Sequence, residues 1–277
     1  MYVPAVPLSG VAGWRFIQAT ETQQRTAFES DATVRREVTY FAERIAEVGS
    51  AQELVADRTL LKVALGAFGL DEEIFKKAFL ERILSEGTDD PEALANRFVD
   101  PRYTEFSRAF GFGDVAGPRV AAPGFAAEIT TAYQTRQFER AVGEVNDDMR
   151  LALNFRREIA TYAGQGEVDP AQWFRILGDS PLRAVVEAAF NLPTAFAGLD
   201  IDKQRETLQD KARELFGSES VAVFQDPANV QRVIDRFLVR SQIESGPGPG
   251  TPGAAALSLL QSSQASSGLT NLILSAR

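Results

Sequence analysis

The sequence predicts an all-α protein of two related helical bundles that arise from an internal duplication, with irregular N- and C-terminal tails. Apolar residues recur at steps of three and four, which is the spacing of one helix face. Asp residues and Asp-Pro pairs stand where such stretches begin, as helix caps do. No alternating apolar run is bounded by hairpin turns, so no strand is predicted. Across the 277 residues, 44% are hydrophobic and 24% charged, as in ordinary globular proteins.

The first half begins with an irregular segment, residues 1–18, which contains several Pro and Gly residues. Residues 19–110 form the first predicted helical repeat. Its helices are expected to begin at four capping residues: Asp31, Ser50, Asp57 and Asp71. In the helix that Asp71 is expected to cap, Ile74 and Phe75 are expected to face the core.

The second half begins after residues 111–124, a Gly- and Pro-containing stretch without periodicity that is predicted to be a linker. Residues 125–243 form the second predicted repeat, which opens with one long helix over 125–162. Residues 244–277 form a Gly/Pro linker followed by an apolar C-terminal segment. Four Asp-Pro pairs are expected to start helices, at 90–91, 100–101, 169–170 and 226–227.

Three segments of the first half have counterparts in the second half, in the same order. Phe41 to Ala46 matches Phe155 to Ala160, the helix from Leu60 matches the helix from Leu182, and Phe-x-Asp-Pro occurs at 98–101 and 224–227. The preceding cap also recurs, as Asp57 and Asp179. These matches predict a duplicated helical unit, and its length is too great for a solenoid repeat.

The chain contains no Cys and no His. It therefore has no disulfide, no thiolate nucleophile, no Cys-based zinc site and no imidazole general base. The available chemistry is that of carboxylates, Lys, Tyr and hard cations bound by oxygen. No cofactor is expected, because the Gly-rich stretches lack the strand and helix that a phosphate-binding loop needs.

The formal net charge of −9 argues against a nucleic-acid-binding protein. No stretch is apolar for long enough to span a membrane, and the N-terminus does not resemble a cleaved secretory signal. Paired acids such as Asp89-Asp90 and Asp147-Asp148 are better explained as caps and solvated surface than as metal ligands, so no metal or catalytic residue is assigned.

The two tails contain the candidate interaction residues, because apolar side chains there have little local structure in which to be buried. The segments could pack on the chain's own bundles, on a protein partner or on another copy of the chain, and the sequence leaves these alternatives open. The candidates are Trp14, Phe16, Ile17, Leu257, Leu260, Leu269, Leu272 and Ile273.

The stretch from Ala95 to Tyr103, ANRFVDPRY, continues to Phe106 and to Ala109-Phe110-Gly111-Phe112. It resembles a bacterial family of unknown function whose members tend to be encoded near flagellar genes. The second copy departs from this pattern, since Asp226-Pro227 is followed by Ala-Asn. The resemblance implies a flagellar accessory, structural or export-related protein, and it transfers no catalytic residue.

Together these observations predict a non-enzymatic interaction protein of the flagellar system, either cytoplasmic or associated with the flagellum. Its expected partners are proteins, with flagellar components first among them. Two alternatives remain: a cytosolic helical scaffold or chaperone, and a helical enzyme that uses carboxylates and a divalent cation.

Overall fold

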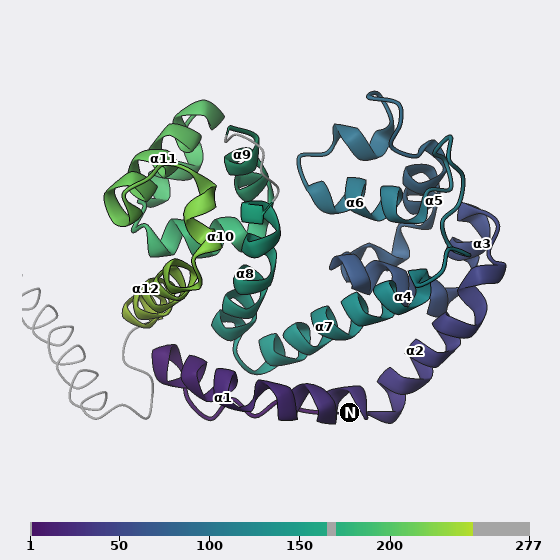
Figure 1. Cartoon of the computed structure of the whole chain (residues 1–277), viewed down its shortest axis with the longest axis horizontal. Helices are drawn as coiled ribbons and strands as arrows, with labels where there is room; N and C mark the ends of the chain where they lie inside the picture. The colour runs from purple at the N-terminus through teal and green to yellow at the C-terminus, as the bar shows by residue number, and fades with distance from the viewer. Residues whose placement is uncertain (1, 165–169, 246–277) are drawn as a thin grey trace, which may run out of the picture.

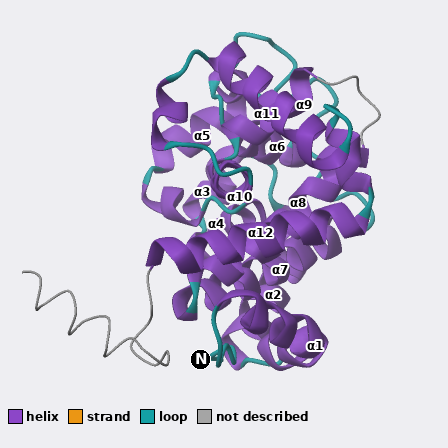
Figure 2. Ribbon diagram, turned by 90° about the vertical axis from the view of Figure 1, so that its left-hand side faces the viewer, coloured by secondary structure: helices purple, strands orange, loops and turns teal. Residues whose placement is uncertain are grey.

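The computed structural model of the chain describes residues 2–164 and 170–245. Every regular element within these residues is a helix, and none of them is in a strand (Figures 1 and 2). The all-α prediction is therefore confirmed. No helix of this part of the chain combines the length and the apolar character that crossing a membrane requires.

The first half of the chain contains six α-helices and three short 3₁₀ helices. They are α1 (Gly10–Glu29), α2 (Ala32–Arg44), η1 (Ile45–Glu47), α3 (Ala51–Ala56), α4 (Arg58–Phe68), η2 (Asp71–Phe75), α5 (Lys77–Glu86), η3 (Leu94–Arg97) and α6 (Pro101–Phe110).

The second half has a similar order of elements over its described residues. They are α7 (Phe125–Val145), α8 (Asp147–Gly164), α9 (Pro170–Gly178), α10 (Ser180–Ala189), η4 (Thr194–Gly198), α11 (Ile201–Phe216), η5 (Val221–Gln225) and α12 (Pro227–Ser245). The shared order is compatible with duplication, which stays a prediction.

Two separate hydrophobic cores divide the molecule into two lobes, seen side by side in Figure 1. The N lobe comprises α3 to α6 with most of α2 and the first half of α7. The C lobe comprises α1, the second half of α7 and α8 to α12. Helix α7 serves both cores: Phe125, Ile129 and Tyr133 belong to the N lobe, and Phe138 and Val142 to the C lobe.

The two cores do not coincide with the predicted repeats 19–110 and 125–243. Helix α1 lies in the first half of the sequence, but Trp14, Ile17 and Phe28 pack in the core of the C lobe. The next helix, α2, places Val34 in that same core and Phe41 in the core of the N lobe. Two continuous helices, α2 and α7, therefore link the lobes.

The prediction that residues 1–18 are irregular is wrong from Gly10 onward, because α1 begins there. Gly and Pro in the sequence lower helix propensity, but tertiary packing outweighs it. Trp14 and Ile17 lie three positions apart on one face of α1 and are completely buried. At Gly13 a side chain would clash with the backbone oxygen of Leu8, 2.1 Å from a Cβ, so this glycine permits the close approach.

The predicted long helix over 125–162 is broken at Asn146. This residue has extended backbone, and its side-chain oxygen accepts a hydrogen bond from the backbone N–H of Met149 at 3.2 Å. Asn146 therefore caps α8. The break lets α7 and α8 meet in the V-shaped arrangement seen in Figure 1.

Most of the predicted caps are confirmed. The carboxylates of Asp31 and Asp57 accept hydrogen bonds from the first backbone N–H groups of α2 and α4. Asp100 does the same for α6, and Asp179 for α10. Helices α6, α9 and α12 begin at the prolines of three predicted Asp-Pro pairs. The pair at 90–91 starts no helix, since residues 91–93 form a turn and bend before η3.

Residues 111–124 are irregular, as their composition predicts. Three of their glycines adopt the left-handed conformation: Gly111, Gly117 and Gly124. Val120 is buried in the core of the N lobe, so the stretch packs on the lobe it leaves and leads into α7.

Candidate functional site

A polar cleft of about 520 Å³ lies between the two lobes, beside α7. At one point the lobes come into contact, where a Cβ on Gly178 would be only 2.7 Å from the backbone oxygen of Val99. The size of the cleft suits a small molecule or a peptide side chain. Its lining residues are Gly69, Leu70, Asp71, Glu72, Glu73, Arg102, Tyr103, Arg136, Glu139, Arg140, Asp147, Arg150, Asn154, Ser180 and Pro181.

The arginines of this cleft are paired with acids of the chain itself. Arg140 lies 3.0 Å from Asp71. Arg150 lies 2.6 Å from Asp147. The guanidinium of Arg102 contacts both carboxylate oxygens of Asp100 and also donates to the backbone oxygen of Gly69 at 2.6 Å. Because these charges are locally neutralised, the cleft is not selective for one sign of ligand charge.

A buried network joins α7 to α8 below the cleft. Arg157 donates two hydrogen bonds to the carboxylate of Glu139, at 2.8 and 2.9 Å, and a third to Glu158. Arg136 also pairs with Glu158. Burial by itself would raise the pKa of Glu158, but the two guanidinium groups hold that pKa below its usual range. The network fixes the angle between the two helices that separate the lobes.

One buried polar atom in the cleft has no partner. The side-chain oxygen of Asn154 is inaccessible to solvent and accepts no hydrogen bond. The residue lies on α8 and is 9% exposed. An unsatisfied acceptor of this kind has an energetic cost that a bound donor relieves.

Two carboxyl groups near the cleft have raised pKa values. Burial raises the pKa of Asp179, although the backbone N–H of Leu182 donates to its carboxylate. Burial, and then the charge of Glu158, raise the pKa of Glu105. Over residues 2–164 and 170–245, no group of three or more acids is arranged to hold a metal ion.

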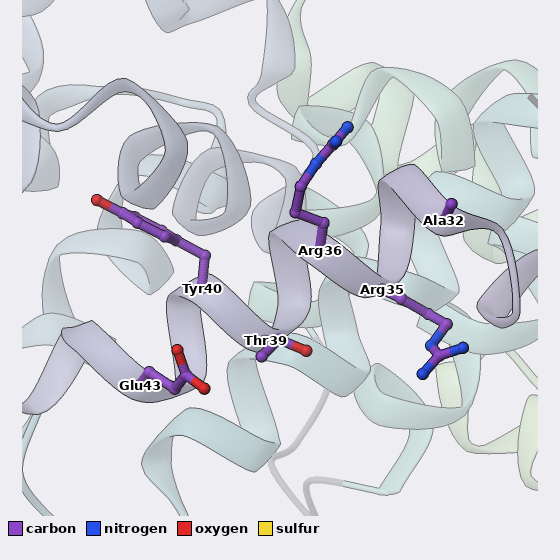
Figure 3. Close-up of a pocket in the computed structure, with 6 residues that line it drawn as sticks. All are labelled: Ala32, Arg35, Arg36, Thr39, Tyr40 and Glu43. Atoms are coloured by element: carbon purple, nitrogen blue, oxygen red, sulfur yellow. The ribbon is translucent and has the colours of Figure 1, made fainter.

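A shallow hollow on the outer face of α2 is shown in Figure 3. All its lining residues come from this one helix: Ala32, Arg35, Arg36, Thr39, Tyr40 and Glu43. Arg35 and Arg36 are exposed and point to different sides of the helix (Figure 3). The hydroxyl of Tyr40 is engaged, since it donates to Asp57 at 2.7 Å. A surface formed by one helix has no opposite wall, so we assign no site to it.

Phe75 is 82% exposed, which corrects the prediction that it faces the core. The exposure of Phe75 follows from the local structure, because residues 71–75 form the 3₁₀ helix η2 and α5 begins only at Lys77. The two segments therefore do not continue one α-helical face. Phe75 lies at a hollow of about 530 Å³ that is also lined by Leu65, Ile74 and Arg140.

A third surface, which we call the α12 groove, lies between α12 and the end of α10. It has a volume of about 460 Å³. Val239 and Ile243 are 46% and 63% exposed and lie one helical turn apart. The groove residues are Ala189, Asn191, Asp235, Arg236, Val239, Arg240 and Ile243.

The structure separates the predicted interaction residues into two groups. Trp14 and Ile17 belong to the chain's own core, which is one of the alternatives that the sequence left open. The indole N–H of Trp14 donates to Gln231 of α12 at 3.2 Å. Phe16 is half-buried on the same helix. The other five predicted residues lie outside the described residues: Leu257, Leu260, Leu269, Leu272 and Ile273.

The cleft and the α12 groove were not predicted from the sequence. The cleft combines residues of η2, α6, α7, α8 and α10, and their meeting depends on how the lobes are placed. The exposed pair Val239 and Ile243 did carry a signal, because both positions fall outside the apolar face that contains Val230, Ile234 and Phe237.

The family model described as "Protein of unknown function (DUF1217)" matches residues 67–230, more than half of the chain. The chain belongs to this DUF1217 family. A crystal structure of protein AGR_C_984 from Agrobacterium tumefaciens is similar, with 26% sequence identity and a TM-score of 0.71. The match covers 88% of this chain and 100% of that chain, so the likeness includes both lobes. No curated protein matches the sequence.

Proposed function

We propose that this DUF1217 protein is a non-enzymatic interaction protein that serves as a structural or accessory component of the bacterial flagellar system. The observation that carries the proposal is exposed apolar surface on the N lobe, where Phe75 and Val99 are each 82% exposed. Exposed apolar surface of this kind is typical of protein contacts.

The ion pairs of the cleft support the same proposal. Arg102, Arg140 and Arg150 are each neutralised by a neighbouring carboxylate. The pair of Arg140 and Asp71 joins α7 to η2, and the other two pairs are each local to one helix. General acid–base chemistry needs a group that can exchange a proton with a substrate. The flagellar setting rests on the resemblance of residues 95–112, which fall within the segment that the family model matches.

The test has two measurements. Swimming is measured in a strain of the source bacterium from which the gene is deleted, and the amount of the protein is measured in flagellar bases purified from the wild-type strain. We expect impaired swimming that the wild-type gene restores. A gene carrying Phe75→Gln and Val99→Gln should not restore it, because this exposed surface loses its apolar side chains.

The matched control changes two exposed polar residues of the same lobe, as Lys77→Gln and Glu92→Gln, and should restore swimming. The flagellar role would be contradicted if the deletion strain swam normally and the wild-type strain contained the protein only in its cytosol. That result would favour a cytosolic scaffold.

A further inference from the structure

The α12 groove exposes apolar side chains that no described element covers. Other faces of α12 pack on neighbouring helices. Arg236 donates to the backbone oxygen of Ala189 of α10 at 2.8 Å, and Ser241 donates to Asp148 of α8. Helix α1 covers a further side, where Gly10 lies against the side chain of Gln242. Val239 and Ile243 remain on the side facing solvent.

We propose that this groove is the docking site of the chain's own C-terminal segment, residues 254–277. The described part of the chain ends at Ser245, two residues after Ile243. The next residues, GPGPGTPG, supply a connection in which the chain direction can reverse, since Gly and Pro favour turns. This inference concerns contacts within one chain and does not depend on the proposed flagellar function.

The chemistry of the segment suits the groove. Residues 254–277 contain one charged residue, Arg277, and are otherwise Ala, Ser, Gln, Leu and similar uncharged residues. Leu269, Leu272 and Ile273 have the i, i+3, i+4 spacing by which a helix anchors in an apolar groove. An uncharged segment also covers Val239 and Ile243 without bringing a second charge against Arg236 or Asp235.

The size of the groove favours a tethered segment over a second copy of the chain. A stable interface between separate proteins buries about 800 Å² on each partner. The α12 groove offers two exposed aliphatic side chains and a volume of about 460 Å³. A short flexible tether gives its segment an effective concentration on the order of millimolar, so a small apolar contact is sufficient.

The N lobe shows the same arrangement with a described segment. There the chain leaves α6, crosses the Gly-containing stretch 111–124 and returns as α7. Helix α7 packs closely on α4 of the lobe it has left, because Gly66 leaves room for the ring of Tyr133. In the C lobe the chain leaves α12 through a Gly- and Pro-containing stretch in the same way.

The test measures how accessible the Ile243 methyl group is to a soluble gadolinium chelate, by methyl NMR of the full chain. In the wild type we expect weak relaxation enhancement, because the segment shields this methyl. Leu269→Gln, Leu272→Gln and Ile273→Gln together should increase the enhancement severalfold. The control with Ser262→Gln, Ser263→Gln and Ser266→Gln should match the wild type.

A groove variant and a reference residue complete the test. Val239→Gln should also increase the relaxation of Ile243, while the Ile201 methyl, on α11 and 46% exposed, should behave alike in all variants. Equal accessibility of Ile243 in the wild type and the triple Leu/Ile variant would overturn the proposal. So would shielding that disappears on tenfold dilution, since it would identify a second copy as the occupant.

Discussion

The two lobes use a similar order of helices but are completed by different helices. The N lobe is completed by α7, which follows it in the sequence, whereas the C lobe is completed by α1 at the opposite end of the chain. As a result, α4 in the N lobe is buried on nearly all sides, while α10 in the C lobe keeps a partly exposed face at Arg183, Glu187 and Ala188. The comparison shows that a similar order of helices can be completed by helices from different parts of the chain.

The largest effects are expected from matched changes in the two cores, Phe41→Ala and Phe155→Ala. Both phenylalanines are completely buried, Phe41 on α2 and Phe155 on α8, and the predicted duplication pairs them. Each change should lower the free energy of unfolding by about 3–5 kcal/mol. The measurement is denaturant unfolding followed by tryptophan fluorescence, since Trp14 and Trp173 both lie in the core of the C lobe.

Because α2 and α7 run through both cores, Phe41→Ala should shift the tryptophan transition as well as the circular dichroism transition. A tryptophan transition that stays unchanged in Phe41→Ala would show that the lobes unfold independently.

The next effect concerns the network that joins α7 to α8. Arg157→Gln removes the partner of Glu139, which is 4% exposed, and one of the two partners of Glu158. Leaving a carboxylate buried without its partner should lower the free energy of unfolding by about 3 kcal/mol. Arg213→Gln on the exposed end of α11 is the control, because surface pairs contribute little. Equal stability of the two variants would contradict a structural role for the network.

A smaller effect distinguishes the helix contacts of the two lobes. Gly66→Ala places a methyl 2.7 Å from the ring of Tyr133, so α7 must shift away from α4. The expected loss is about 1–2 kcal/mol, despite the better helix propensity of Ala. Gly198→Ala, where no atom lies within 4 Å of the added carbon, should leave thermal stability nearly unchanged. A stabilising Gly66→Ala would mean that α4 and α7 do not pack as closely as described.

The effect of pH follows from carboxyl groups whose pKa differs between the folded and unfolded states. Glu158 has a lowered pKa in the folded protein, so its stabilisation is present above the pKa of the unfolded chain and is lost as pH falls through the folded value. Glu105 has a raised pKa, so protonation on mild acidification relieves its unfavourable ionised state. Stability should therefore rise slightly on mild acidification and then fall.

The predicted pH dependence is tested by measuring the free energy of unfolding across acidic pH. The measurement compares the wild type with Glu158→Gln and Glu105→Gln. Glu158→Gln should reduce the steepness of the fall at low pH. Glu105→Gln should diminish the slight rise, and Asp179, whose pKa is also raised, should maintain the rest of it. Parallel curves for all three proteins would show that these carboxyl groups do not control the acid response.

The parts of the fold that depend on neighbouring residues could be predicted from the sequence. Asp31 and Asp57 cap helices because an Asp side chain reaches the next backbone N–H groups in almost any protein. The helix break at Asn146 was missed although Asn is also a capping residue, because the apolar spacing continues across it. Phe75 was placed in the core because the same spacing does not distinguish a 3₁₀ turn from an α-helix.

The candidate sites required the tertiary structure. Trp14 is buried by α12, more than 200 residues away in the sequence, and no local pattern indicates that contact. The cleft depends on the angle between α7 and α8, which the Arg157 network fixes. The C-terminal candidates were found from composition alone, since an uncharged Leu-rich segment after a Gly/Pro linker is visible in the sequence.

The most direct test of the account is hydrogen exchange across both lobes, measured by mass spectrometry for the full chain and for the chain ending at Ser245. Removing residues 246–277 should speed exchange severalfold in the groove region of α10 and α12, around Ala189 and residues 235–243. Exchange in α4 and α7 should stay the same, because the N lobe has its own covering helix. Identical exchange in α10 and α12 of both proteins would contradict the claim that the C-terminal segment covers the α12 groove.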